Sequence, residues 1–154
     1  MEKIKVLIAD DMQVIAECVK QKINENDKFE VIGIANNGEE EYNMILTLKP
    51  DIVFTDNKMP YMNGIDVIEK IKKLEINNKP KFVLLTSQAD RFFYTLCAEL
   101  DIIAVISKPI SYDRITQIMN EIIDIREHPI YQNTNSTTKN SIFTKLINIF
   151  KGGN

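Results

Sequence analysis

Five side chains that could do chemistry follow the ends of short apolar runs in this sequence. They are Asp10, Asp11, Asp56, Thr86 and Lys108. Each has an ordinary explanation when it is taken singly, because Asp and Thr are common helix caps and turn residues, and a loop lysine is usually solvated. As a set they offer three carboxylates, a hydroxyl and an ammonium group. Their chemistry therefore depends on whether the fold brings them to one place.

The apolar runs before these residues have the composition of buried β-strands. They are short, rich in Val and Ile, and mostly continuous rather than alternating, as strands covered on both faces are. We predict strands at Lys5–Ala9, Phe29–Ala35, Ile52–Thr55, Phe82–Thr86 and Ile102–Ile106.

Segments with helical spacing of apolar residues follow each predicted strand. Their apolar positions are Val14, Ile15, Cys18, Val19 and Ile23; Tyr42, Ile45, Leu46 and Leu48; Ile65, Val67, Ile68 and Ile71; Phe92, Phe93, Leu96 and Leu100; and Ile115, Ile118, Met119, Ile122 and Ile123. Five strand–helix pairs in strict alternation imply right-handed crossovers. The sequence therefore predicts an α/β fold, a doubly wound parallel sheet with helices on both faces.

In such a sheet the carboxyl ends of the strands lie along one edge, where ligands bind. Clustered carboxylates repel one another unless a cation intervenes, and Mg²⁺ suits one or two carboxylates, a backbone carbonyl and several waters. Lys108 and Thr86 would instead contact an anionic group, such as the oxygens of a phosphoryl group. We predict that Asp56 is a nucleophile that accepts a phosphoryl group while a metal ion and Lys108 neutralise its oxygens.

At these positions the sequence resembles the receiver domain of two-component response regulators. The resemblance covers about residues 3–125 and rests on four motifs in order: Ile-Ala-Asp-Asp (8–11), Asp-Asn-Lys-Met-Pro-Tyr-Met-Asn-Gly (56–64), Leu-Thr-Ser (85–87) and Ser-Lys-Pro (107–109). It implies a flavodoxin-like (βα)5 fold with strand order 2-1-3-4-5. It also implies phosphotransfer to Asp56 from a phosphohistidine on a sensor histidine kinase or a phosphotransfer protein. Such a module catalyses its own phosphotransfer and autodephosphorylation without being a conventional enzyme.

The resemblance also implies a set of Mg²⁺ ligands. Asp11 and Asp56 would ligate the ion, and Asp10 would help directly or through water. The backbone carbonyl of Lys58 would be a further ligand.

For the phosphoryl group the resemblance implies contacts from Thr86 and Lys108, with a cis peptide bond between Lys108 and Pro109. Two positions depart from the family pattern. Val105 stands where many receivers have a Tyr or Phe that turns inward on phosphorylation, so the usual threonine–aromatic coupling is in doubt. Asp101 stands where the family often has Gly, and Asp tolerates the left-handed conformation better than most residues.

Composition and charge limit the classes of function. The two cysteines lack metal-ligand spacing, which favours reduced thiols in a cytoplasmic protein. The sequence also has no apolar run near the ~20 residues that a membrane span needs. The chain has a net charge of −3, but residues 126–154 are basic, so residues 1–125 are more acidic than the whole. An acidic body argues against nonspecific binding of nucleic acid.

The composition changes after residue 126. We predict a receiver domain at residues 1–126, a flexible Asn/Thr/Ser-rich linker at residues 127–140 and a short amphipathic helix at residues 141–151. The apolar face of that helix needs a surface, because so short a helix is marginal in water. Three targets stay open: its own receiver or a second copy, a groove on a partner protein, and an anionic membrane surface.

Three functions fit these observations to different degrees. The first is a regulator that acts on an unidentified downstream protein, because 29 residues after the receiver are too few for a DNA-binding domain. The second is the receiver of a longer transcriptional regulator whose effector domain is absent from this sequence. The third is an Asp-nucleophile phosphatase of the haloacid dehalogenase type, which needs a second acid where this chain has Lys58.

Overall fold

The computed structural model describes residues 2–128, in which strand and helix alternate five times. The strands are β1 (Ile4–Ala9), β2 (Phe29–Ala35), β3 (Ile52–Asp56), β4 (Lys81–Thr86) and β5 (Ala104–Ser107). The helices are α1 (Gln13–Asn24), α2 (Gly38–Leu48), α3 (Gly64–Lys73), α4 (Arg91–Glu99) and α5 (Tyr112–Glu127).

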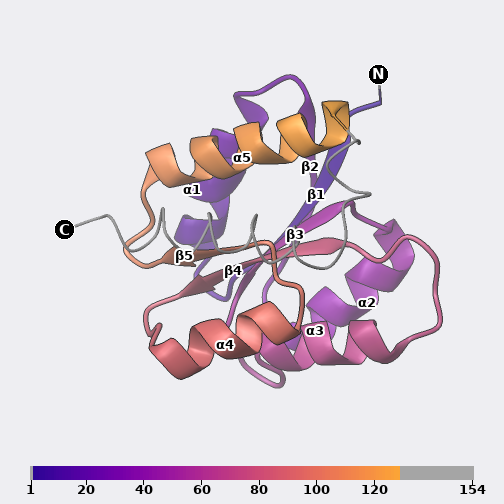
Figure 1. The fold of residues 1–154 in the computed structure, drawn as a ribbon, viewed down its shortest axis with the longest axis vertical. Helices are drawn as coiled ribbons and strands as arrows, with labels where there is room; N and C mark the ends of the chain where they lie inside the picture. Colours follow the sequence, from indigo (N-terminus) through magenta and orange to yellow (C-terminus); the bar gives the residue numbers. More distant parts are fainter. Residues whose placement is uncertain (1, 129–154) are drawn as a thin grey trace.

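All strand pairs are parallel and the strand order is β2-β1-β3-β4-β5. Helices α1 and α5 cover one face of this sheet, and α2, α3 and α4 cover the other (Figure 1). The predicted doubly wound, flavodoxin-like fold is confirmed. Because β1 and β3 lie in the middle of the sheet, the residues that follow them sit at the centre of its carboxyl edge.

Each face of the sheet has its own apolar core. On the α1 and α5 side, side chains such as Ile8 and Phe54 pack against Val19 and Ile115. On the opposite side the intervening residues of the same strands, such as Leu7, pack against α2, α3 and α4. Since both faces are buried, these strands need no polar alternation, which is why their sequences are continuous apolar runs.

Four of the apolar residues with helical spacing lie in the predicted helices but are not buried. Val14 is 76% exposed and Phe92 is 79% exposed, and Leu46 and Leu48 also lie at the surface. The buried face of α1 instead includes Ala16. Val14 lies two residues before Ala16, about 200° around the helix, and therefore points away from the sheet.

Strand β5 begins at Ala104, two residues later than predicted. Ile102 is fully buried, but its amide donates to the carbonyl of Cys97 and closes the end of α4. Asp101 has a φ of 55°, so the left-handed conformation anticipated there is confirmed. The burial of Ile102 therefore reflects the turn into the sheet and not the strand itself.

The predicted amphipathic helix at residues 141–151 and nearly all of the predicted linker lie outside the described residues. Among the described helices, none has both the length and the apolar character needed to cross a membrane.

Candidate functional site

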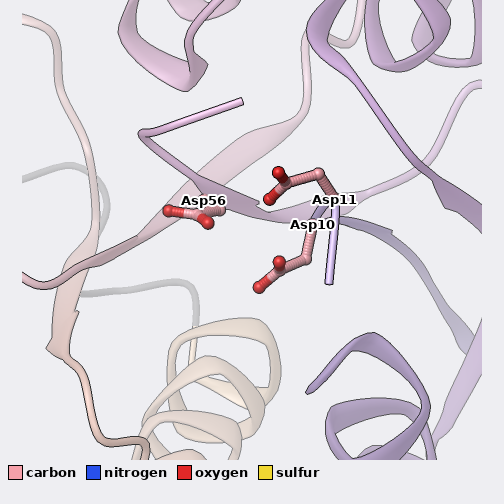
Figure 2. A group of neighbouring side chains, drawn as sticks. All are labelled: Asp10, Asp11 and Asp56. Carbon is pink, nitrogen blue, oxygen red and sulfur yellow. The ribbon is translucent and has the colours of Figure 1, made fainter. Parts of the chain in front are cut away.

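Three carboxylates meet at the carboxyl edge of the sheet. Asp10 and Asp11 follow β1, and Asp56 is the last residue of β3, which pairs with β1 up to Ala9 and Thr55. One oxygen of each carboxylate lies within 4.8 Å of the others (Figure 2). Asp10 is 0% exposed and Asp56 is 6% exposed, whereas Asp11 is open to solvent. The pairing of β1 with β3 therefore creates the cluster.

Lys108 links two of these carboxylates from the loop after β5. Its Nζ atom donates to Oδ2 of Asp10 at 3.1 Å and to Oδ2 of Asp56 at 2.9 Å. Burial lowers the pKa of Lys108, but the hydrogen bonds and charges of Asp56 and Asp10 outweigh that effect and raise it overall. Burial, together with the negative charge of Asp56, raises the pKa of Asp10 against the opposing contributions of the Met12 amide and Lys108. Lys108 therefore stays charged beside a carboxyl that loses its proton less readily than usual.

The loop after β3 orients the other oxygen of Asp56. The backbone N–H of Lys58 donates to Oδ1 of Asp56 at 3.1 Å, and the side chain of Lys58 is exposed. Asn57 braces the loop, because its carbonyl accepts from the amide of Gly64. A Cβ on Gly64 would lie 2.6 Å from the Asp56 carbonyl oxygen, so the start of α3 can approach this strand end only with glycine.

Thr86, the last residue of β4, lines an open groove of about 680 Å³ together with Asp56 and Lys58. Its hydroxyl donates to the carbonyl of Gln88 at 2.8 Å and accepts from the amide of Gln88 at 3.1 Å. Contact between this hydroxyl and a group on Asp56 therefore requires it to leave the carbonyl of Gln88.

The structure thus brings Asp10, Asp11, Asp56 and Lys108 into one cluster and places Thr86 on its rim. The peptide bond before Pro109 is cis, as the resemblance implied. The donor set fits a hard divalent cation, because it offers carboxylate oxygens from three residues in a partly open site.

Residues 6–120 match the family model described as the response regulator receiver domain. The chain belongs to this family. Membership sets aside the haloacid dehalogenase alternative, which already lacked the second acid at Lys58.

Curated relatives of this receiver domain are enzymes that are much longer than the chain. It is 33% identical over 136 residues to a protein-glutamate methylesterase/protein-glutamine glutaminase of Clostridium acetobutylicum, covering 88% of this chain and 39% of that protein. It is 37% identical over 108 residues to the protein of the same description in Bacillus subtilis, covering 69% of this chain and 29% of the relative. The chain therefore spans less than half of either relative.

A solved receiver domain has the same fold. The receiver domain of AraT, a response regulator from Geobacillus stearothermophilus, superposes with a TM-score of 0.70 at 26% identity. The match covers 81% of this chain and 96% of that one.

Sequence reasoning missed one polar pair beneath the receiver's acidic site. Glu41 on α2 is 0% exposed, and the hydroxyl of Thr55, next to Asp56, lies 2.9 Å from its Oε2. A signal was present in the sequence, because Glu41 precedes the buried Ile45 by four residues and so falls on the same helix face.

Proposed function

We propose that this protein is a phosphorylation-controlled response regulator that accepts a phosphoryl group on Asp56. The donor would be a phosphohistidine of a sensor histidine kinase or of a phosphotransfer protein. One observation carries the proposal: the Asp56 carboxylate is held between the Lys108 ammonium at 2.9 Å and the Lys58 amide at 3.1 Å. Two more carboxylates lie within 4.8 Å.

In the transfer step a carboxylate oxygen of Asp56 attacks phosphorus. An O–P bond forms while the P–N bond of the phosphohistidine breaks, and its electron pair returns to the imidazole nitrogen. Catalysis of such a step is mostly positioning and charge neutralisation. Lys108 would neutralise one phosphoryl oxygen once it releases Asp56 Oδ2, and the Thr86 hydroxyl would donate to another.

Mg²⁺ would be held by Asp10, Asp11, Asp56 and the backbone carbonyl of Lys58. When bound, the ion would neutralise negative charge on the phosphoryl group, which would otherwise be repelled by the three carboxylates. The burial of Asp10 and the exposure of Asp11 support a site closed on its protein side and open to water on the other. Release of the phosphoryl group as phosphate needs a water in line with phosphorus, and the groove beside Lys58 offers it a route.

We propose that the output passes through protein–protein contacts in the cytoplasm, without direct binding of nucleic acid. The alternative is a receiver that controls an attached effector domain. It is supported by the match to the Clostridium relative, of which this chain covers only 39%. The length of the natural gene product distinguishes the two.

Incubation with Mg²⁺ and acetyl phosphate, followed by intact-mass analysis and peptide mapping, tests the phosphoacceptor. The expected product is one base-labile acyl phosphate on Asp56, absent from Asp56→Asn and reduced in Asp11→Asn at limiting Mg²⁺. A phosphoryl group mapped to any other residue of the wild type would refute the assignment.

A further inference from the structure

Glu41 occupies a position for which the chemistry of phosphotransfer has no direct use. It lies in the first turn of α2, fully buried, behind the strand that ends in Asp56. Of its two carboxyl oxygens, Oε2 is paired with the Thr55 hydroxyl, and Oε1 has no hydrogen-bond partner among the described residues. Carboxylates are almost never buried in this way without a cation, so its environment demands an explanation.

The number of hydrogen atoms available for the contacts of Thr55 explains the burial of Glu41. The Thr55 Oγ1 atom lies 2.9 Å from Oε2 of Glu41 and 3.3 Å from the backbone carbonyl oxygen of Asp56. A hydroxyl has one hydrogen, whereas an ionised carboxylate and a carbonyl can only accept. An ionised Glu41 would therefore accept the single hydrogen of the Thr55 hydroxyl and leave none for the Asp56 carbonyl. A protonated Glu41 donates to Thr55 instead, so that Thr55 can donate to Asp56 and both contacts are made.

Close backbone contacts surround this pair. A Cβ on Gly64 would lie 2.9 Å from Thr55 Oγ1, so the start of α3 sits directly against the hydroxyl. A Cβ on Gly38 would lie 1.9 Å from the carbonyl oxygen of Met62, so the start of α2 meets the loop after Asp56 backbone to backbone. The start of α2, which carries Glu41, therefore lies directly against the loop that carries the Lys58 amide.

We propose that Glu41 is a positioning residue that, in its protonated form, holds the Thr55 hydroxyl on the backbone carbonyl of Asp56 and so fixes the phosphoacceptor. The inference rests on the proposed function of Asp56. Loss of the Glu41 proton breaks the hydrogen bond from Thr55 to the Asp56 carbonyl and places a negative charge beneath the loop that follows Asp56. Both changes lower the rate of phosphorylation.

Burial raises the pKa of Glu41 to about 8. The hydrogen bond that Thr55 can donate to the ionised carboxylate acts in the opposite direction and lowers the pKa. Other ionisable groups on α2 and on the elements packed against it lie at least partly in solvent, except for Asp56 on β3. They are Glu39 and Glu40 on α2, Lys5 on β1, Glu30 on β2, and Asp66, Glu69, Lys70, Lys72 and Lys73 on α3. Lys70 lies over the ring of Tyr42.

The test compares phosphorylation by acetyl phosphate in the wild type, Glu41→Gln, Thr55→Val and Thr55→Ser. In Glu41→Gln the side-chain amide N–H can donate to Thr55 as the protonated acid does, but it has no proton to lose in this pH range. We therefore expect equal rates below the pKa of about 8 and a wild-type rate that falls relative to Glu41→Gln above it. Thr55→Val should lower the rate about fivefold below the pKa of about 8, the usual effect of one hydrogen bond, and the difference from the wild type should shrink above it. Thr55→Ser should restore the rate.

Carbon-13 NMR of glutamate-labelled protein gives a second readout that needs no phosphorylation. One side-chain carboxyl should titrate near pH 8 and disappear in Glu41→Gln, while Glu39→Gln, an exposed control on the same helix, leaves it in place. Ordinary titration of every glutamate, or identical rate–pH profiles in the wild type and Glu41→Gln, would overturn the inference. If the wild type accepted no phosphoryl group at all, the proposed function would fail, and the carboxyl titration would still decide the state of Glu41.

Discussion

The Lys108 ammonium lies 2.9 Å from Oδ2 of Asp56, although the two residues are 52 positions apart in the chain. The same ammonium lies 3.1 Å from Asp10. The cation is therefore shared between the proposed phosphoacceptor and a carboxylate that a metal ion would also use. Lys108 therefore offsets part of the repulsion within the acidic cluster.

Removal of that lysine should destabilise the protein most when Mg²⁺ is absent. Lys108→Met keeps most of the side-chain volume but leaves two buried carboxylates without their cation, a change that costs about 3 kcal/mol. Urea unfolding in EDTA should show this loss, and added Mg²⁺ should recover part of it. Lys3→Met, at an exposed position, is the matched control. Equal stabilities of Lys108→Met and wild type in EDTA would contradict this account.

The exposed side chain of Lys58 should set the lifetime of the acyl phosphate. Lys58 and Gln88 both line the groove beside Asp56, so they can obstruct or orient the attacking water. We expect a lifetime longer than that of fast chemotaxis-type receivers, and Lys58→Ala should hydrolyse several-fold faster than Lys73→Ala, an exposed control on α3. Loss of phosphoryl label after removal of the donor measures both rates. Unchanged hydrolysis in Lys58→Ala would end the shielding hypothesis.

Glu41 should make the free energy of unfolding depend on pH. Its pKa is raised from 4.5 to about 8 in the folded protein, so the folded state keeps a proton that the unfolded chain releases. The stabilising contribution is complete below pH 4.5 and is lost progressively as the pH rises to about 8. The limiting slope for one proton is about 1.4 kcal/mol per pH unit. Urea unfolding of the wild type and Glu41→Gln should therefore differ by an amount that changes through this window, and a constant difference would argue against a buried neutral acid.

Deletion of residues 141–154 should leave phosphorylation of Asp56 intact, because every residue of the acidic cluster lies before residue 127. We expect the deletion to change docking, self-association or signalling output. Sedimentation with anionic liposomes separates a membrane target from a protein target, and sedimentation velocity reports self-association. A truncated protein with unchanged oligomeric state and unchanged signalling would show that the segment is dispensable.

The fold and the acidic cluster were predictable because both follow from where apolar runs stop. Continuous runs ending at Ala9 and Thr55 identify buried parallel strands, and parallel strands place their ends on one edge. The orientation of helix faces was less predictable. Phe92 belongs to an apolar pattern, but the residue of α4 that turns fully into the core is Cys97. Spacing defines a stripe on a helix without saying which edge of that stripe meets the sheet.

The Glu41 pair could not be derived for a different reason. An acid near the start of a helix is an ordinary sequence feature, since it is favoured there by the helix dipole. Its burial depends on the close approach of Gly38 and Gly64 to distant backbone atoms, which no local pattern expresses. Contacts of that kind emerge only after the strands and helices have assembled.

If Thr86 contacts a phosphoryl group on Asp56, as we propose, the local turn between Thr86 and Gln88 becomes a switch with two competing acceptors. The hydroxyl of Thr86 can serve the carbonyl of Gln88 or a phosphoryl oxygen, and it cannot donate its single hydrogen to both. The segment released by that exchange leads directly into α4, where Phe92 is exposed. A partner that binds this segment more tightly after its release from Thr86 is thermodynamically linked to phosphorylation. Phosphorylation raises the affinity for such a partner by a certain factor, and the bound partner raises the equilibrium constant of phosphorylation by the same factor. Downstream targets of this receiver would then act as allosteric effectors of its phosphorylation equilibrium.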